Sequence, residues 1–214
     1  MSKKQVLKSR LADGAAEIGI RVDEKQLQTL LAYLDLLRRW NRVYNLTAVK
    51  SGTEMLTRHL LDSLSVVPYL QGKKVVDIGS GAGLPGVPVA VACPDKQITL
   101  LDSGAKRCRF LRQVQAELNM QNVTVVQQRA EEYRPAEKFD NLLSRAFSNL
   151  QDFIDCSRHL LAEGGQLLAM KGAWSGEEAA ELPAGFIIKS VVELTVPGLP
   201  EQRHLVICEQ SDQM

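Results

Sequence analysis

The chain has 214 residues, of which 45% are hydrophobic and 24% are charged, which is typical of a soluble globular protein with one full domain and an appendage. Its 26 lysines and arginines nearly balance its 25 aspartates and glutamates, so net charge alone identifies no class of partner. No apolar run approaches the roughly 20 residues of a membrane span, and no apolar stretch follows Lys3 and Lys4 as in a signal peptide. We therefore expect a cytoplasmic protein that contacts no membrane.

The spacing of apolar residues predicts three helices within residues 1–70. Asp23 is placed to cap the second helix, and the third begins near Thr53 and ends before Pro68. We expect Trp40 and Tyr44 to take part in helix packing. The apolar faces of the first two helices consist of Val6, Leu7, Leu11 and Ile18, and of Leu27, Leu30, Leu31, Leu34, Leu37 and Trp40.

From Lys74 onward, short apolar runs alternate with helical stretches. Such alternation predicts an α/β fold, with a mostly parallel sheet covered by helices on both faces. The last two runs are joined by a segment rich in proline and glycine, which predicts an antiparallel hairpin at one edge. The expected strands are 75–78, 98–101, 123–126, 139–143, 166–170, 186–194 and 204–208, and the expected helices are 85–92, 106–118 and 150–161.

The four cysteines argue against a metal site. Cys93, Cys108, Cys156 and Cys208 form no CxxC pair, and no histidine stands at ligand spacing from them. Scattered cysteines in a chain of this length are typical of reduced thiols in the cytosol. We therefore expect no bound metal.

A glycine-rich loop follows the first expected strand and indicates a cofactor. Glycines stand at positions 79, 81, 83 and 86, and glycine lets a ligand lie directly against the backbone. Residues 81–86 match the GxGxxG pattern of dinucleotide-binding proteins, with Asp102 where those proteins place a ribose-binding acid. Against that interpretation, the strand ends before the pattern begins, and Pro85 lies inside the turn that would bind pyrophosphate.

The pattern Asp77-x-Gly79-x-Gly81-x-Gly83 instead resembles motif I of class I S-adenosylmethionine-dependent methyltransferases. That cofactor has no phosphates, so the glycines would serve close approach of the backbone. Asp77 would offset its cationic α-amino group, and Asp102 would accept hydrogen bonds from its ribose hydroxyls. The alternative roles are a loop cap for Asp77 and a helix cap for Asp102.

The sequence lacks the residues that two kinds of methyl transfer require. Methylation of exocyclic amines of bases typically uses an Asn/Asp-Pro-Pro-aromatic run after the fourth strand, where residues 141–147 read NLLSRAF. Methylation at C5 of pyrimidines needs a cysteine nucleophile, usually beside a proline, and the sequence has no Pro-Cys dipeptide. A target with its own lone pair, such as purine N7, needs neither, because alignment of the reacting atoms suffices.

Short motifs from residue 25 to residue 208 resemble those of one family, the bacterial ribosomal small-subunit RNA methyltransferase G, also called glucose-inhibited division protein B. The resemblance implies a Rossmann-like class I methyltransferase domain at residues 71–214 and an N-terminal helical extension at residues 1–70. The motifs are Asn45-Leu46-Thr47, Arg58-His59-Leu60-Leu61-Asp62-Ser63, the loop 77–86, Leu101-Asp102-Ser103, Lys106-Arg107 with Phe110-Leu111, Ser144-Arg145-Ala146, Lys171-Gly172 and Arg203-His204.

The resemblance implies that S-adenosylmethionine is the methyl donor and that N7 of one guanine in 16S rRNA is the acceptor, within the small ribosomal subunit or its precursor. It also implies cofactor contacts by Gly79, Leu84, Ala130, Glu131 and Arg145. Nothing in it demands more than a monomer. An alternative from another class is an rRNA-binding module that no longer catalyses, against which the intact glycine loop argues.

Arg145, His59 and Arg58 are the residues expected at the reaction centre. Arg145 follows the fourth strand, where substrate enters a fold of this class, and the alternative is a salt bridge to Glu131 or Asp102. We expect His59 to position or stack on the substrate, because attack by N7 requires no base.

Arg58 is expected at the junction of the extension and the cofactor cleft. The alternative for Arg58 is an intrahelical ion pair with Asp62, four residues later.

Basic side chains near these positions are candidates for contact with RNA. Residues 1–60 and residues 106–112 are both rich in lysine and arginine, which suits a polyanionic partner but also a solvated helix face. Since the methylated guanine is cationic, we expect these side chains to contact phosphates around the site. The candidates are Lys106, Arg107, Arg109, Lys171, Arg203 and His204.

Overall fold

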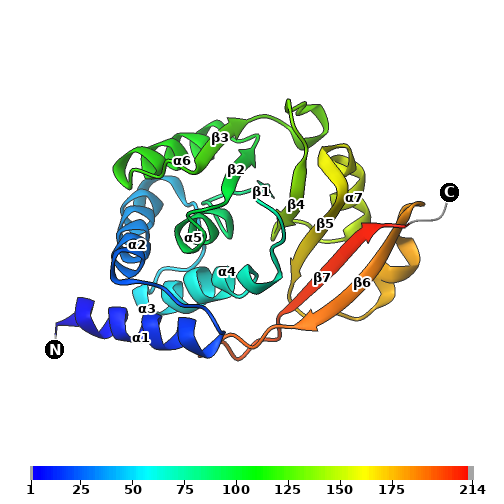
Figure 1. The fold of residues 1–214 in the computed structure, drawn as a ribbon. Helices are drawn as coiled ribbons and strands as arrows, with labels where there is room; N and C mark the ends of the chain where they lie inside the picture. Colours follow the sequence, from blue (N-terminus) through cyan, green and yellow to red (C-terminus); the bar gives the residue numbers. More distant parts are fainter. Residues whose placement is uncertain (1, 212–214) are drawn as a thin grey trace.

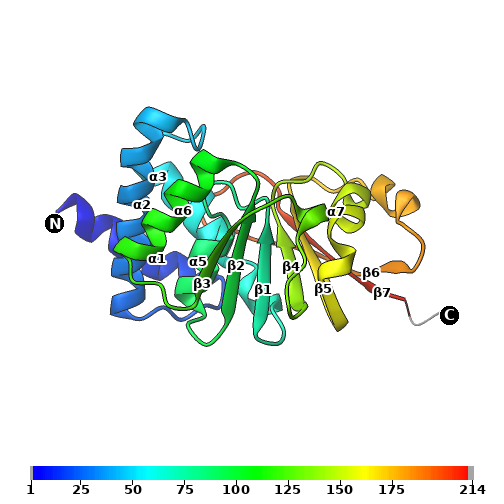
Figure 2. The same cartoon turned by 90° about the horizontal axis from the view of Figure 1, so that it is seen from above.

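A seven-stranded sheet forms the centre of the structure, a computed structural model that describes residues 2–211. The strand order is β3-β2-β1-β4-β5-β7-β6, and β7 runs antiparallel to both of its neighbours while the other pairs are parallel (Figures 1 and 2). The strands are β1 (Lys74–Ile78), β2 (Gln97–Asp102), β3 (Val123–Gln127), β4 (Phe139–Ser144), β5 (Leu161–Lys171), β6 (Phe186–Glu193) and β7 (His204–Gln210).

Helices cover the sheet on both faces, as the alternation of the sequence predicts. The N-terminal helices, α5 and α6 share one buried cluster with the sheet, and α7 belongs to a second cluster on the opposite face (Figure 2). Among residues 2–211, no helix combines the length and the apolar composition that crossing a bilayer requires. The longer helices are α1 (Lys3–Glu17), α2 (Glu24–Tyr44), α5 (Gly86–Ala92), α6 (Ala105–Glu117) and α7 (Leu150–Ser157).

Local sequence signals fix the ends of α2. The Asp23 side chain accepts a hydrogen bond from the Gln26 N–H, and the Gln26 side chain accepts one from the Asp23 N–H, which is a capping box. Asn45 ends the helix in the left-handed conformation, which asparagine tolerates better than most residues. The predicted cap at Asp23 is therefore confirmed.

The third predicted helix has an unexpected centre. It begins as α3 (Gly52–Met55), widens into the π-helical segment η1 (Leu56–Leu61) and ends as α4 (Asp62–Leu64). π-Helical turns inside helices are frequent at functional sites. Arg58 and His59, both expected at the reaction centre, lie on this segment.

Two local predictions are wrong. Strand β5 begins at Leu161, which pairs with Phe139 of β4, although the Gly164-Gly165 pair predicts that the preceding helix ends there. The strand tolerates these glycines because the register shifts between Phe139 and Asn141. Val6 is 51% exposed, because only the Leu7 and Leu11 side of α1 faces the core.

Further structural elements are short. They are the 3₁₀ turns η2 (Val67–Tyr69), η3 (Ala130–Glu132), η4 (Arg158–Leu160) and η5 (Glu177–Glu181).

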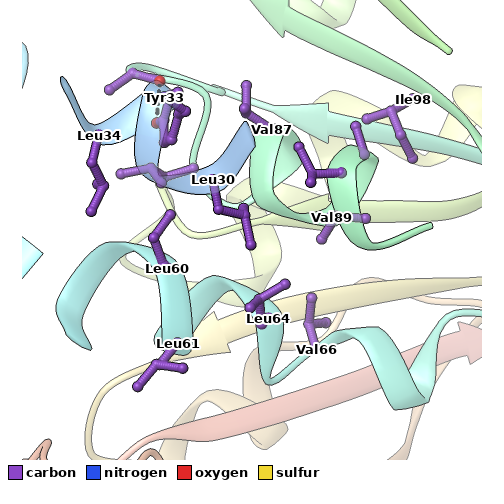
Figure 3. Close-up of a cluster of buried hydrophobic side chains, with 14 of the residues drawn as sticks. Leu30, Tyr33, Leu34, Leu60, Leu61, Leu64, Val66, Val87, Val89 and Ile98 are labelled. Carbon is purple, nitrogen blue, oxygen red and sulfur yellow. Dashed lines mark hydrogen bonds between the residues drawn. The ribbon is translucent and has the colours of Figure 1, made fainter. Parts of the chain in front are cut away.

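The extension shares a hydrophobic core with the sheet. Leu30 and Tyr33 from α2 and Leu60 from η1 lie in one buried cluster with Val87 of α5 and Ile98 of β2 (Figure 3). The Tyr33 hydroxyl donates a hydrogen bond of 2.7 Å to the carbonyl of Ala82, inside the glycine-rich loop. The extension therefore supports the loop directly, while the division of the chain at residue 70 stays a prediction.

Replacement of Tyr33 by phenylalanine should destabilise the fold by about 1–3 kcal/mol, because the buried Ala82 carbonyl would lose its side-chain partner. Urea unfolding followed by circular dichroism measures this change. Tyr44→Phe on the same helix is the matched control, since no hydrogen bond of its hydroxyl is found within residues 2–211. Equal stabilities of the two variants would show that the Tyr33 hydrogen bond contributes nothing.

Candidate active site

The glycine-rich loop leaves the carboxyl end of β1, which lies between β2 and β4. Gly79, Gly81 and Gly83 have positive φ angles of 70°, 58° and 88°, which residues with a Cβ rarely adopt. Among residues 2–211, a Cβ on Gly81 would meet only a carbonyl of its own loop at 3.8 Å, whereas one on Gly83 would collide with Val87 and Leu111. Gly81 thus borders open space at the point where the strand order reverses, where sheets of this kind bind ligands.

Asp102 stands beside this open space, at the end of β2. Its Oδ2 accepts a hydrogen bond of 2.9 Å from the Gly81 N–H, and its Oδ1 accepts one of 2.7 Å from the Gly104 N–H. The guanidinium of Arg107, an expected RNA contact, lies 3.4 Å from Oδ2. Asp102 therefore joins the glycine loop to the loop before α6. One lone pair of Oδ1 has no partner within residues 2–211, and the side chain is only 2% exposed.

Asp77 lies beneath the loop and has no exposed surface. Its Oδ2 accepts a hydrogen bond of 2.9 Å from the Gly86 N–H, whereas its Oδ1 has no partner within residues 2–211. Burial raises the pKa of this carboxyl to about 7, against the opposing effects of the Gly86 N–H and Arg145. In this structure Asp77 holds the start of α5, which is the loop-cap alternative to direct cofactor contact.

The other expected cofactor contacts differ in accessibility. The Leu84 side chain is buried in the core below the loop, so only its backbone is placed to meet a ligand. Ala130 and Glu131 lie on the 3₁₀ turn after β3, with Ala130 half-buried and Glu131 exposed. These two residues follow the strand next to β2, as the sequence predicts.

A pocket of ≈ 390 Å³ opens at the carboxyl ends of β4 and β5. It brings together five of the residues expected at the reaction centre or on RNA, from segments far apart in the sequence. His204 stands beside it, where its Nδ1 lies 2.7 Å from the carbonyl of Gly172 in the pocket wall. The lining residues are Val49, Arg58, His59, Asp62, Arg145, Met170, Lys171, Gly172 and Arg203.

The segment that follows β4 contacts the start of the glycine-rich loop. The Ser144 hydroxyl donates a hydrogen bond of 2.8 Å to the Ile78 carbonyl at the end of β1. A Cβ on Gly79 would lie 3.0 Å from the Cβ of Ala146. Arg145, which lines the pocket, therefore stands between two residues that contact the end of β1 and the start of the glycine-rich loop.

Asp62 is the charge centre of the pocket. Its Oδ2 accepts a hydrogen bond of 2.8 Å from Arg145 Nη1, and its Oδ1 accepts one of 3.1 Å from Arg203 Nε. The carboxylate is only 1% exposed. Arg145 therefore binds neither Glu131 nor Asp102, the two alternatives that the sequence suggests.

Arg58 makes different ion pairs from the one considered in the sequence. Its Nε lies 2.9 Å from Glu54, and its Nη2 contacts Glu201, so the intrahelical pair with Asp62 is not formed. Asp62 faces the sheet, where the two arginines meet it. A lone acid among Leu60, Leu61 and Leu64 was the available sequence signal for this buried position.

His59 is buried and uncharged near neutral pH. Burial, and secondarily the charge of Arg145, lowers the pKa of its imidazole to about 4. Its Nε2 lies 2.9 Å from the Thr47 hydroxyl, while Nδ1 has no partner among the described residues. Such a weak base suits positioning better than proton removal.

Lys171 differs from its expected role as an RNA contact. Its Nζ donates to the Ser148 carbonyl and to Glu178, both at 2.8 Å, and is only 3.4 Å from the Phe147 carbonyl. The side chain is almost completely buried. Because its three donors are already directed at the protein, Lys171 fixes the loop after β4 and has no donor left for a phosphate.

Lys106 and Arg109 on α6 are exposed, and neither takes part in a salt bridge within residues 2–211. Phe110 and Leu111 on the same helix are buried, as the sequence predicts. No group of three or more metal-ligating side chains is found in the described part of the chain.

An Asp62→Asn variant should lose about 2 kcal/mol of unfolding free energy, less than the roughly 3–5 kcal/mol of a fully buried ion pair, because Arg145 and Arg203 keep some solvent contact. Asp35→Asn is the control, since its pair with Arg38 is exposed and should contribute under 1 kcal/mol. Chemical denaturation measures both changes. Equal losses in the two variants would contradict a structural role for Asp62.

The buried carboxyl of Asp77 should also be visible in the pH dependence of stability. Its pKa rises from 3.8 to about 7 on folding, so the folded state holds this proton more tightly than the unfolded state. The contribution of this group to stability is therefore lost as the pH rises from about 4 to about 7. Relative to the wild type, Asp77→Asn should gain stability across that interval, as measured by urea unfolding at several pH values. A constant difference between the two proteins would refute the shift.

The strand order, the antiparallel β7 and the open glycine loop define a class I S-adenosylmethionine-dependent methyltransferase fold. A solved S-adenosylmethionine-dependent methyltransferase from Thiobacillus denitrificans, in complex with S-adenosyl-L-homocysteine, matches with a TM-score of 0.52 and 12% identity, over 82% of this chain and 98% of that one. At this identity the likeness establishes the fold alone.

Sequence comparison gives the family. The family model described as rRNA small subunit methyltransferase G matches residues 26–206. A ribosomal RNA small subunit methyltransferase G of Ectopseudomonas mendocina (strain ymp) is 50% identical over 99% of this chain and 100% of its own length. Its counterpart in Salmonella paratyphi B is 48% identical over 95% and 98%, respectively. The chain therefore belongs to the ribosomal RNA small subunit methyltransferase G family.

Proposed function

We propose that this protein transfers a methyl group from S-adenosylmethionine to N7 of one guanine in 16S rRNA, within the small ribosomal subunit or its precursor. The observation that supports this most is that the segment carrying Arg145, which lines the pocket, lies against Ile78 and Gly79 at the start of the glycine-rich loop. A cofactor loop next to a pocket suits a methyl donor and an acceptor base. We further propose that the protein acts as a cytoplasmic monomer.

The residues at the end of β1 and β2 fit the cofactor. Gly81 has room above its Cα that a side chain would fill, and Asp102 retains an acceptor for a ribose hydroxyl beside it. Gly79 and Arg145 are proposed to contact the cofactor from the loop and from the end of β4, and the turn of Ala130 and Glu131 is the proposed contact for adenine. When bound, the cofactor supplies an electrophilic methyl group.

The pocket suits an acceptor that has its own lone pair. His59, with a pKa of about 4, stays neutral and removes no proton at neutral pH. Guanine N7 needs no proton removal, so the pocket has only to align the base with the methyl donor. The role of His59 and Arg58 is therefore to shape the pocket that receives the base.

The charges of the pocket also suit this reaction. Methylation at N7 makes the base cationic, and bare positive charges beside it would oppose the transfer. The cations that line the pocket are each paired with an acid of the protein. Asp62 binds both Arg145 and Arg203, while Lys171 binds Glu178 and Arg58 binds Glu54 and Glu201.

Methyl transfer to the small subunit tests this function directly. Labelled S-adenosylmethionine is incubated with the protein and small subunits that lack the modification, with naked 16S rRNA as the comparison substrate. Label at a single guanine N7 is the expected result, and mapping of the modified base identifies it. Absence of label in both substrates would refute the proposed function.

Ligand-induced stabilisation separates this function from the dinucleotide alternative. S-Adenosylmethionine should raise Tm, because a ligand that binds only the folded state stabilises it by mass action, and NAD should leave Tm unchanged. An increase in Tm with NAD but not with S-adenosylmethionine would favour a dinucleotide-binding protein instead. Stabilisation by S-adenosylmethionine without methyl transfer would favour the non-catalytic RNA-binding module.

An Arg145→Ala variant should lose about 100-fold in kcat/KM, the typical cost of misplacing reacting groups. The loss of stability should be small, about 1 kcal/mol, because Asp62 keeps Arg203 as a partner. Arg39→Ala, at an exposed salt bridge with Glu117, is the control for activity. An unchanged methylation rate in Arg145→Ala would show that Arg145 has no role in methyl transfer.

A further inference from the structure

A second pocket, of ≈ 420 Å³, opens on the N-terminal extension between the end of α2 and the start of α3. We call it the extension pocket. Its polar lining is basic and amide-rich, and no acid belongs to it. The lining residues are Arg38, Asn41, Arg42, Asn45, Lys50 and Met55.

The basic side chains of the extension pocket form no short salt bridge with an acidic side chain among residues 2–211. Arg38, Arg42 and Lys50 are all exposed. Among residues 2–211, the only salt bridge made by any of them joins Arg38 to Asp35 at 3.6 Å, and that aspartate is itself largely exposed. This differs from the pocket of ≈ 390 Å³ around Arg145, which we call the active-site pocket. There each cation has a closer acid partner.

One linker separates the two pockets. Val49 lines the active-site pocket, and the next residue, Lys50, lines the extension pocket. On the helix that follows, Met55 lines the extension pocket and Arg58 lines the active-site pocket. The two pockets therefore adjoin the same linker and the same helix.

The linker is held in place by side chains of both pockets. Asn41 Nδ2 donates to the Thr47 carbonyl, and Asn41 Oδ1 accepts from the Thr47 N–H, at 2.9 Å and 2.8 Å. The hydroxyl of Thr47 lies 2.9 Å from Nε2 of His59. Hydrogen bonds through Thr47 thus connect Asn41 of the extension pocket to His59 of the active-site pocket.

We propose that the extension pocket binds a backbone phosphate of the RNA strand next to the nucleotide that is methylated. This inference rests on the proposed function, because it takes RNA as the substrate. Arginine forks recognise phosphate oxygens by paired hydrogen bonds, and the Asn45 and Asn41 amides add further polar atoms to the wall. Uncompensated charge serves a phosphate here, whereas it would oppose formation of a cationic base in the active-site pocket.

The test compares small subunits bound to the wild type and to an Arg42→Ala, Lys50→Ala double variant over a range of salt concentrations. Loss of one phosphate contact should reduce the slope of log K against log[salt] by about 1 and weaken binding equally for different flanking sequences. In methylation assays KM should rise about tenfold, with a much smaller change in kcat.

Lys25→Ala, at the opposite end of α2, is the matched control and should retain the wild-type salt slope. The Tm increase caused by S-adenosylmethionine should be the same in all three proteins, which shows that the cofactor site is intact. An unchanged salt slope in the double variant, or a fall in kcat at constant KM, would overturn the proposal. The salt dependence of binding tests the extension pocket even if the wild type transfers no methyl group. Failure of the proposed function and failure of the proposed phosphate site therefore give different results.

Discussion

The carboxylate of Asp62 organises the substrate side of this molecule. It belongs to the helical extension, yet its two oxygens hold arginines that follow β4 and precede β7. A buried carboxylate is costly unless it is paired and hydrogen-bonded, so the pocket depends on all three segments meeting. The same contacts neutralise the arginines. Thus one acid both positions Arg145 and pairs the charges of two arginines that line the pocket proposed to receive the base.

In the function proposed here, the two pockets divide the tasks of RNA recognition by their charge. Beside Arg145, acids of the protein balance the cations, whereas Arg42 and Lys50 are left without close acid partners. Phosphate contacts position a nucleic acid, and contacts with the base provide specificity and chemistry. The extension therefore does more than complete the hydrophobic core. It contributes walls to both pockets, and Tyr33 supports the cofactor loop from below.

Local signals in the sequence were sufficient for much of this structure. The helix cap at Asp23, the positions of the seven strands and the glycine-rich loop depend on neighbouring residues and were found where the sequence predicts them, apart from the early start of β5 at Leu161. The pairing of Asp62 with Arg203 depends on a contact across 141 residues, which spacing along the chain does not reveal. The same holds for Lys171, whose buried amino group is committed to the loop after β4. The π-helical turn at Leu56–Leu61 has no recognisable signal in the local sequence.

The C-terminal hairpin has a consequence for how the protein is made. Strand β7 is inserted between β5 and β6, and Arg203, which immediately precedes it, leaves a translating ribosome only after the extension and the first five strands. The extension and the first five strands can emerge and pack while this arginine is still missing from Asp62. A nascent chain that has not yet reached Arg203 consequently lacks one of the two arginines that bind Asp62, so its pocket is still incomplete.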